Sequence, residues 1–439
     1  MSWRLKYGDT AVTFTAPGEV PATQLAAPAF TPLLDPPQAV RDALDAPAGS
    51  PRLRDLAAGA RKVLLVVPDL AQPAGLPVVL LQVLDVLQDS GVGLRQVEIL
   101  VARGMRSRLE ADEAERLIGP EVWNRVTVRQ HDPEDREALT DLGETERGTP
   151  LWLNRCTMES GQLLILAGSI YPEAATGFFG GPALVLPGLA GQDSALANRR
   201  LVLAEPPVLG FHPDCRPGEL EGNPVYEDSV EAADKVEPDF LVHTVLDEDG
   251  RMVRVVAGEW RRAFENGCTW LRGKLRVPVN EPRAWAVASA GGAVRDHDFV
   301  RAHGPLGVAA SCVRDGGHLV YLAECAAGLG SSELEAWMAR GSAAAVEAAL
   351  REAYHPDGHV ALALKQITER IQVHLVSALP EEQVAGLGLR PHATVESAWA
   401  AVAAEVPEAA PGFVVPAPAK VLLGVPTPRE PVVGEHTVA

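Results

Sequence analysis

Three short runs of mostly apolar residues constrain the fold of this chain more than any other feature. They are Lys62–Val67, Gln96–Ala102 and Leu163–Ala167. Each run is short and rich in Val, Leu or Ile, which is typical of a strand that is buried on both faces of a sheet. Between the first two runs, Leu76–Asp89 has helical periodicity and ends before Gly91. Strands that alternate with helices predict an α/β fold with a mostly parallel sheet.

The second part of the chain repeats this pattern. Trp285–Ala290 and His318–Ala323 predict strands, and a polar helix is expected from about Asp296 to Ala302. We therefore predict two α/β domains, an N-terminal one over residues 1–274 and a C-terminal one over 275–439. Because ligands of such sheets bind outside the carboxyl ends of the strands, a ligand cleft is expected between the two domains.

The segment Ser169–Gly188 directly follows one of the predicted buried strands. Within this segment, Gly177, Gly180 and Gly181 lie in a run of five consecutive residues, which also contains Phe178. Glycine permits positive φ and has no Cβ, so that backbone amides can approach a phosphate or a cofactor closely. A tight turn that needs glycine only for its backbone would give the same pattern, and glycine spacing alone does not separate the two interpretations.

Charge and cysteine content exclude several classes of function. The chain has 58 acidic and 39 basic residues, a net charge of −19, which argues against a nucleic-acid partner. Its five cysteines form no C-x-x-C pair, so neither a zinc site nor a disulfide framework is expected. No apolar run of about 18 residues predicts a membrane span. Met1–Lys6 lack the apolar core of a signal peptide, and a cytoplasmic protein is expected.

Polar residues follow the predicted strands of the first domain. Asp69 and Gln72 come after the first strand, and Arg103 and Arg106 come after the second. In a parallel sheet these positions should converge with the glycine-rich loop at residues 177–181.

A series of short motifs, in order along nearly the whole chain, resembles the nickel-dependent lactate racemase family. The motifs are Lys6-Tyr-Gly8, Ala39-Val-Arg-Asp-Ala-Leu44, Ser50-Pro-Arg-Leu-Arg54, Asp69 with Pro73, Gly104, His131-Asp132, Leu142-Gly143, Arg147-Gly-Thr-Pro150, Gly177-Phe178 with Gly180-Gly181, Leu186-Pro-Gly188, Gly222-Asn-Pro-Val225, Gly291-Gly292 and Gly328-Leu-Gly330. The resemblance implies the fold of that family and a nickel-pincer nucleotide as its cofactor. In the family a lysine tethers the cofactor, a histidine helps to hold nickel, and two histidines act as acid and base while the metal accepts hydride from a 2-hydroxy acid.

The motifs that carry the family's acid, base and carboxylate-binding groups have other residues in this chain. The substrate arginine of an Asp-x-Thr-Arg-Pro motif falls on Gln72, between Asp69 and Pro73. The first acid/base histidine falls on Arg106, and the second, in a Pro-His pair, falls on Glu173. Imidazole has the near-neutral pKa that this proton transfer needs, which guanidinium and carboxylate groups ordinarily lack.

The cofactor-holding positions differ as well. The tethering lysine falls on Ala183, which has no amine, and the nickel histidine falls on Arg199. In the second domain a substrate lysine falls on His303, and a one-residue deletion leaves the family's glutamine position at either Val300 or Arg301. We therefore predict no cofactor and no metal site.

The sequence is consistent with three hypotheses for function. The chain is a divergent family member that binds or converts a small anionic metabolite, a non-catalytic scaffold or regulatory homologue, or a racemase or epimerase of 2-hydroxy acids that holds nickel through altered ligands. Arg103, Arg106 and Arg199 could form a basic site with Asp69 and Glu173, or could simply form ion pairs with them. Whether the chain is an enzyme, forms a homo-oligomer or pairs with an active homologue is left open by the sequence.

Overall fold

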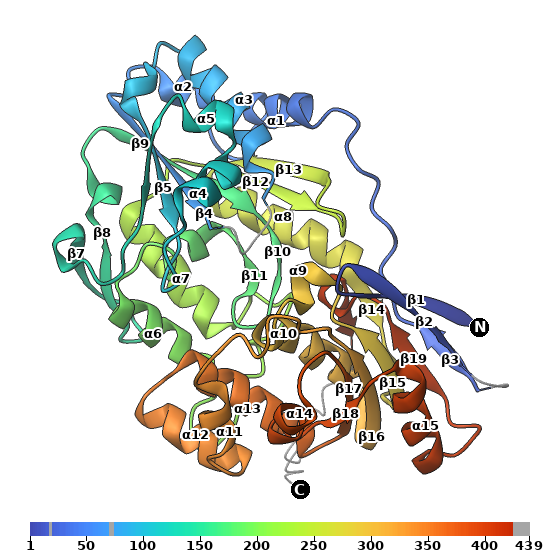
Figure 1. Ribbon diagram of the computed structural model, residues 1–439. Coiled ribbons are helices and arrows are strands. Elements are labelled where there is room, and N and C mark those ends of the chain that lie inside the picture. The colour runs from blue at the N-terminus through green and yellow to red at the C-terminus, as the bar shows by residue number, and fades with distance from the viewer. Residues whose placement is uncertain (17–19, 70–73, 425–439) are drawn as a thin grey trace, which may run out of the picture. The chain divides into compact units, whose positions relative to one another are not determined.

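The computed structural model describes residues 1–16, 20–69 and 74–424, which form two compact units. The N-terminal unit comprises Pro28–Lys274 and Glu347–His355, and the C-terminal unit comprises Met1–Ala27, Leu275–Val346 and the chain from Pro356 onwards. Figure 1 shows the elements of both units along the chain.

The N-terminal unit is built on a sheet with the strand order β13-β12-β9-β4-β5-β6. Neighbouring strands are parallel except β12 and β13, which form an antiparallel hairpin. Its elements are α1 (Pro36–Asp45), α2 (Leu53–Ala57), β4 (Lys62–Pro68), α3 (Leu76–Asp89), η1 (Leu94–Gln96), β5 (Val97–Ala102), α4 (Ala111–Ile118), α5 (Pro120–Trp123), β6 (Thr127–Gln130), η2 (Arg136–Ala138), β7 (Leu139–Glu144), β8 (Pro150–Asn154), η3 (Arg155–Met158), β9 (Gln162–Ser169), β10 (Tyr171–Glu173), β11 (Gly177–Phe179), η4 (Gly181–Leu184), α6 (Gln192–Arg200), α7 (Pro224–Val236), β12 (Phe240–Leu246), β13 (Met252–Gly258) and α8 (Trp260–Leu275).

The C-terminal unit has a second sheet, in the order β18-β17-β16-β15-β19-β3, whose neighbouring strands are all parallel. Its elements are β1 (Ser2–Tyr7), β2 (Thr10–Thr15), β3 (Ala22–Gln24), β14 (Arg276–Pro278), β15 (Arg283–Ser289), α9 (Ala293–Asp296), α10 (Phe299–Ser311), β16 (Val313–Leu322), α11 (Leu334–Met338), the first turn of α12 (Ala343–Glu352), α13 (Pro356–Thr368), β17 (Gln372–Val376), α14 (Glu381–Gly386), β18 (Arg390–His392), α15 (Val395–Glu405), β19 (Gly412–Val415), η5 (Pro418–Lys420) and β20 (Leu422–Gly424). The mostly parallel α/β class that the sequence predicts is confirmed.

The strands of the first sheet are buried on both faces, as their composition requires. Residues Val63, Leu65 and Val67 of β4 pack in one core with α1 and α3. The alternate residues Leu64 and Val66 are equally inaccessible and point to the opposite face, because successive side chains of a strand alternate. The short helix η4, which belongs to the glycine-rich segment, contacts both β4 and β9.

The division into units differs from the predicted one at two places. The predicted N-terminal domain included residues 1–27, but β3 pairs with β19 and thus extends the second sheet. Conversely, Glu347–His355 belongs to the N-terminal unit, because Glu347 accepts a hydrogen bond from the Gly210 amide at 2.7 Å and Arg351 donates to the Ala204 carbonyl at 2.7 Å. The helix expected at Asp296–Ala302 is divided, because the Asp298 side chain caps a new helix, α10, by accepting from the Arg301 amide.

Gly412 shows how tightly the second core is packed. A Cβ at this position would lie 2.0 Å from the ring of Trp285, which is 1% exposed and donates its indole N–H to the Ala410 carbonyl at 2.9 Å. Because the ring cannot move without losing this hydrogen bond, we expect Gly412→Ala to lower the free energy of unfolding by about 1–3 kcal/mol. Urea unfolding measures the change.

Gly307 provides the matched control. It lies in α10 of the same unit, is exposed, and has no heavy atom within 4 Å of a built Cβ. Gly307→Ala should leave stability unchanged or raise it by about 0.5–1 kcal/mol, because alanine favours the helix. Equal destabilisation by both substitutions would contradict the packing explanation.

Candidate functional site

The glycine-rich segment lies at the carboxyl end of β9, where an α/β sheet ordinarily binds its ligand. After Ser169 the chain forms the small β10–β11 hairpin, in which the rings of Tyr171 and Phe179 stack at 5.1 Å, and then enters η4. Gly177, Gly180 and Gly181 have φ values of 74°, 109° and 51°. These positive values are ones that side chains with a Cβ rarely adopt.

The space beside these glycines is occupied by the protein itself. A Cβ at Gly181 would lie 2.6 Å from the Phe264 ring, and one at Gly177 would lie 1.8 Å from the Glu219 carbonyl oxygen. A Cβ at Gly180 would lie 2.6 Å from the Ser169 carbonyl oxygen. The glycines therefore permit close contacts within the N-terminal unit, and these contacts account for their presence whether or not a ligand binds.

His243 on β12 anchors the segment. The Gly181 amide donates to its Nε2 at 2.8 Å, and its Nδ1 lies 2.9 Å from the Val242 carbonyl, so Nδ1 carries the proton. Burial lowers the pKa of His243 to about 4, which keeps the ring neutral and Nε2 available as an acceptor. His243 is not among the site residues predicted from the sequence, although a histidine within the apolar run Phe240–Leu246 is a signal for it.

Glu173 and Arg199, the residues at two of the family's histidine positions, form an ion pair. Glu173 Oε2 lies 3.7 Å from an Arg199 guanidinium nitrogen, and it also accepts hydrogen bonds at 2.8 Å from the amide and the hydroxyl of Thr176. Burial opposes ionisation, but Arg199 and the Thr176 donors together hold the pKa of Glu173 below its ordinary value. Glu173 is therefore a carboxylate near neutral pH, with no proton to donate.

Asp69 and Arg106 form a second, more exposed pair. Asp69 is 7% exposed at the end of β4, and its Oδ2 lies 3.4 Å from Arg106 Nε, whose side chain is 60% exposed. Arg103 instead serves the backbone: it donates to the His131 carbonyl at 2.6 Å and also pairs with Asp132. The structure thus separates Arg103 from Arg106 and Arg199, with which the sequence predicts a shared basic site.

The loop that carries Arg106 contacts the end of the glycine-rich segment. The Gly104 amide donates to the Gly188 carbonyl at 3.0 Å. Nearby, buried His131 contacts the Ala190 carbonyl through Nε2 at 2.9 Å and Asn154 through Nδ1 at 3.1 Å. Both ring nitrogens of His131 thus bind protein groups, and burial lowers its pKa, so this histidine is a structural connection between the two loops.

Tyr354 lies near the Glu173–Arg199 pair and is not among the site residues predicted from the sequence. It comes from the short Glu347–His355 segment, which the sequence assigned to the other domain. Burial raises its pKa, and the charges of Arg199 and Glu173 both act on its hydroxyl.

Cys215 lies in the same neighbourhood, where burial raises the pKa of its thiol to about 12. The thiol therefore stays protonated and is not a nucleophile.

The remaining predicted site residues have diverse surroundings. Ala183 is 2% exposed in η4, and Phe178 is 1% exposed in β11 with the Arg272 guanidinium 6.0 Å from its ring centroid. His303 lies on α10 of the C-terminal unit, with Nδ1 against the Val300 carbonyl. Gln72 lies outside the described residues. Across residues 1–16, 20–69 and 74–424, no three His, Cys, Asp or Glu side chains are grouped so as to hold a metal ion.

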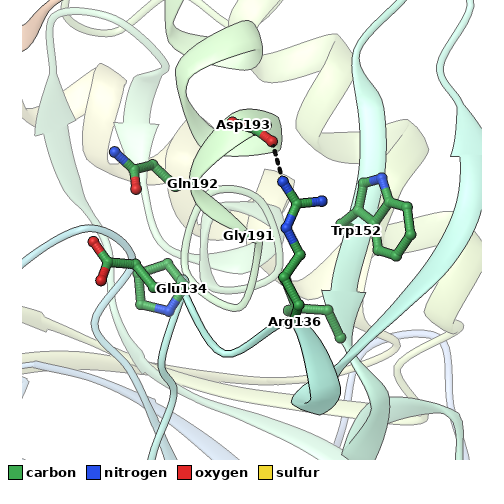
Figure 2. Close-up of a pocket in the computed structure, with 8 residues that line it drawn as sticks. Glu134, Arg136, Trp152, Gly191, Gln192 and Asp193 are labelled. Atoms are coloured by element: carbon green, nitrogen blue, oxygen red, sulfur yellow. Dashed lines mark hydrogen bonds and ion pairs between the residues drawn. The ribbon is translucent and has the colours of Figure 1, made fainter.

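A cavity of about 180 Å³ lies beside the start of α6 (Figure 2). None of the predicted site residues lines it. Arg136 lies over the Trp152 ring at 5.5 Å and pairs with Asp193 at 2.6 Å, as the dashed line in Figure 2 shows. Because Glu134 and Asp193 outnumber the single arginine, this cavity does not suit an anionic ligand.

Comparisons with known proteins agree with this architecture. Residues 7–208 match the lactate racemase N-terminal domain. The chain is 28% identical to a lactate racemase of Thermoanaerobacterium thermosaccharolyticum over 68% of either chain. It is 27% identical to a lactate racemase of Lactiplantibacillus plantarum over 65% of either chain.

Solved structures show the same fold over a greater length. The lactate racemase apoprotein from T. thermosaccharolyticum has a TM-score of 0.87 at 24% identity, over 96% of this chain and 100% of that one. A protein from Thermotoga maritima has a TM-score of 0.64 at 16% identity, over 90% of this chain and all of its own. Within the described ranges, no helix has the length and apolar character needed to cross a bilayer. The domain match over residues 7–208, the two relatives and the shared fold together support membership of this chain in the lactate racemase family.

Proposed function

We propose that this chain is a divergent lactate-racemase-family protein that works without the nickel-pincer nucleotide and binds a small anionic metabolite through Arg106 and Arg199. The family depends on that nucleotide. The observation that carries the proposal is the side chain at the position of the family's tethering lysine. Ala183 has only a methyl group there, is 2% exposed, and lies on a segment that packs against β4 and β9. A methyl group cannot form the covalent bond that the family's lysine forms.

The donor set around the segment also does not fit nickel. The position of the nickel histidine carries Arg199, a permanent cation with no lone pair to offer, which pairs with Glu173. His243 is the nearest imidazole to the glycines, and its Nε2 already accepts from the Gly181 amide. A tethered, metal-holding cofactor therefore has neither its anchor nor its ligand here.

Racemisation by acid–base chemistry lacks suitable groups as well. A general acid or base works best with a pKa near the operating pH. Arg106 stays protonated, and the pKa of Glu173 is lowered by Arg199 and Thr176 against the effect of burial. Both groups are therefore suited to bind charge and unsuited to move a proton.

Loose ion pairing supports anion binding. Arg106 and Arg199 approach their carboxylates at 3.4 and 3.7 Å, whereas charge-assisted hydrogen bonds are about 2.7–2.9 Å long. The Arg106 side chain is 60% exposed and the Arg199 side chain is 23% exposed, so N–H groups of both guanidinium groups remain accessible to a ligand. The two arginines lie near opposite ends of the glycine-rich segment. Arg199 of α6 pairs with Glu173 near the start of the segment, and Arg106 is on the loop whose Gly104 amide donates to the Gly188 carbonyl at its end. A carboxylate or phosphate is the ligand that a guanidinium binds best.

The first test addresses the cofactor. Protein purified from cells that make the nickel-pincer nucleotide should have the intact mass of the bare polypeptide and far less than one nickel per chain. A lactate racemase produced in the same cells serves as the positive control for cofactor supply. A covalent adduct or stoichiometric nickel on the wild-type chain would refute the proposal.

Ala183→Lys is the matched variant for this test. It restores the amine at a site that is otherwise unchanged, while Arg199 remains at the nickel position. We expect its mass to stay that of the polypeptide, because the anchor alone does not supply the missing metal ligand. An adduct on this variant alone would show that Ala183 is the single obstacle to cofactor attachment.

The second test addresses the ligand. Calorimetric titration with D-lactate, L-lactate, glycolate and inorganic phosphate at low ionic strength should detect binding of at least one anion. Arg106→Gln and Arg199→Gln should each weaken it by about 10- to 100-fold, because a hydrogen bond to a charged group contributes about 1.5–3 kcal/mol. Lactate should leave the mixture with its configuration unchanged.

Arg116→Gln controls for net charge. Arg116 lies on α4, its side chain is 68% exposed, and it is 4.0 Å from Asp112, so its loss removes one positive charge away from the glycine-rich segment. This variant should bind the anion as the wild type does. If no anion binds the wild type, the non-catalytic scaffold is favoured, in agreement with the protein groups that fill the space beside Gly177 and Gly181.

A further inference from the structure

Three buried or half-buried histidines form a continuous row in the C-terminal unit. His318 on β16, His374 on β17 and His392 on β18 come from neighbouring parallel strands. His318 Nδ1 lies 3.2 Å from His374 Nε2, and His374 Nδ1 lies 3.0 Å from His392 Nε2. His374 is fully buried, His318 is 4% exposed and His392 is half-buried. Both ring nitrogens of His374 are thus engaged by other imidazoles.

Strand register places the row on a single face of the sheet. Val320 pairs with His374 and Val376 pairs with His392, so these residues point the same way as their partners. Val320 and Val376 pack in one core with Val395 and Trp399 of α15. The row therefore lies in the layer between the sheet and α15, at the side of the sheet that ends in β18.

The six imidazole nitrogens of the row can bind a limited number of protons while both hydrogen bonds between the rings remain intact. The three neutral rings carry three N–H groups, of which two lie in the N–H···N contacts and one lies on an outer nitrogen, His318 Nε2 or His392 Nδ1. One added proton fills the other outer nitrogen. His374 can then donate to both neighbours, and the charge can pass to either outer ring by a shift of the shared protons. Both hydrogen bonds survive this first protonation.

A second added proton has no such place. Five protons on six nitrogens would put two protons into one N···N contact, where a donor would face a donor. That contact must open, and the two charged rings would also repel each other in a buried layer. The geometry of the row therefore allows a first added proton without loss of a hydrogen bond, whereas a second added proton breaks one of the two contacts.

Few other charges act on the row. Arg390 on β18 and Glu405 at the end of α15 pair with each other at 2.5 Å. Their charges shift the pKa of His318 and of His374 in opposite directions, whereas Arg390 lowers the pKa of His392 without an opposing contribution from Glu405. Of the other acidic residues on the helices that pack nearby, Glu381 and Glu382 of α14 and Glu396 of α15 are exposed to solvent. On β16, Asp315 is exposed and pairs with Arg370. Burial is the first cause that lowers the pKa of all three rings, to about 4 for His374.

We propose that the His318–His374–His392 row is a proton-sensing element of the C-terminal unit, which accepts one proton without structural change and releases the edge strand β18 when it accepts a second. β18 is suited to release because it has three residues and pairs with β17 on one side only. The direction in which stability changes with pH follows from the lowered pKa values of the three rings. The unfolded chain binds more protons below about pH 6.5, so the contribution to stability is complete above that pH and is lost as the pH falls towards 4.

Two measurements on the full-length protein test the proposal. Selective ¹⁵N-histidine labelling reports the tautomer and charge of each ring by NMR between pH 7.5 and 4.5. Hydrogen exchange with mass detection, corrected for the intrinsic pH dependence of exchange, reports the protection of the β18 peptide. We expect a pH interval with one charge on the row and β18 protected, followed by loss of protection as the second charge enters.

Two variants separate the row from ordinary histidine titration. His392→Gln keeps an amide nitrogen and oxygen that can hydrogen-bond to His374 Nδ1 but removes one titrating ring. It should retain β18 protection to lower pH than the wild type. His297→Gln removes an exposed histidine of the same unit and should change neither readout.

Several outcomes would overturn the proposal. One is three rings that titrate independently near pH 6.5, and another is a second charge that enters with β18 still protected. A third is His392→Gln losing β18 protection at the same pH as the wild type. Because His392 is half-buried and the glutamine can keep the contact, this variant is expected to fold at neutral pH, where hydrogen exchange of the other sheet strands checks that it has done so.

Discussion

The close approach of the glycine-rich segment to the central strands of the first sheet is the constraint on which the N-terminal unit depends. Gly181 meets the Phe264 ring and donates its amide to His243, while Gly180 meets the carbonyl of Ser169. These contacts leave no room for a Cβ, and they fix η4 against β4 and β9. Because burial keeps His243 neutral, its Nε2 remains an acceptor for the Gly181 amide, and the segment is held by a hydrogen bond within the core.

The charged groups around the segment follow from that packing. Once the β10–β11 hairpin is set, Glu173 receives the Thr176 amide and hydroxyl, and its charge is balanced by Arg199 from the last turn of α6. Asp69 and Arg106 repeat the arrangement at the ends of β4 and β5. Desolvated carboxylates of this kind need a cation, yet both pairs are longer than direct charge-assisted hydrogen bonds. The guanidinium groups therefore retain binding capacity, which is the physical basis of the proposed anion site.

Much of the fold could be predicted from the sequence, because its signals are local. The apolar run at Lys62–Val67 and the periodic segment Leu76–Asp89 correspond to β4 and α3. Contacts between residues that are far apart in the sequence could not be predicted from these local signals. The pairing of β3 with β19 joins residues nearly 400 positions apart. Tyr354 lies in the Glu173 neighbourhood on a segment that the hydrogen bonds of Glu347 and Arg351 hold to the N-terminal unit. The histidine row likewise exists only because three strands align in register.

A resemblance carried by glycines and one carried by reactive side chains support different conclusions. Gly177, Gly180 and Gly181 are required by contacts with Glu219, Ser169 and Phe264, none of which is a ligand. Selection for packing would therefore keep them in a chain that no longer binds the family's cofactor. Ala183 is different, because a buried methyl group satisfies packing equally well but cannot do the chemistry of an amine. The backbone of this segment thus gives evidence for ancestry and fold, and the side chain at position 183 gives evidence about function.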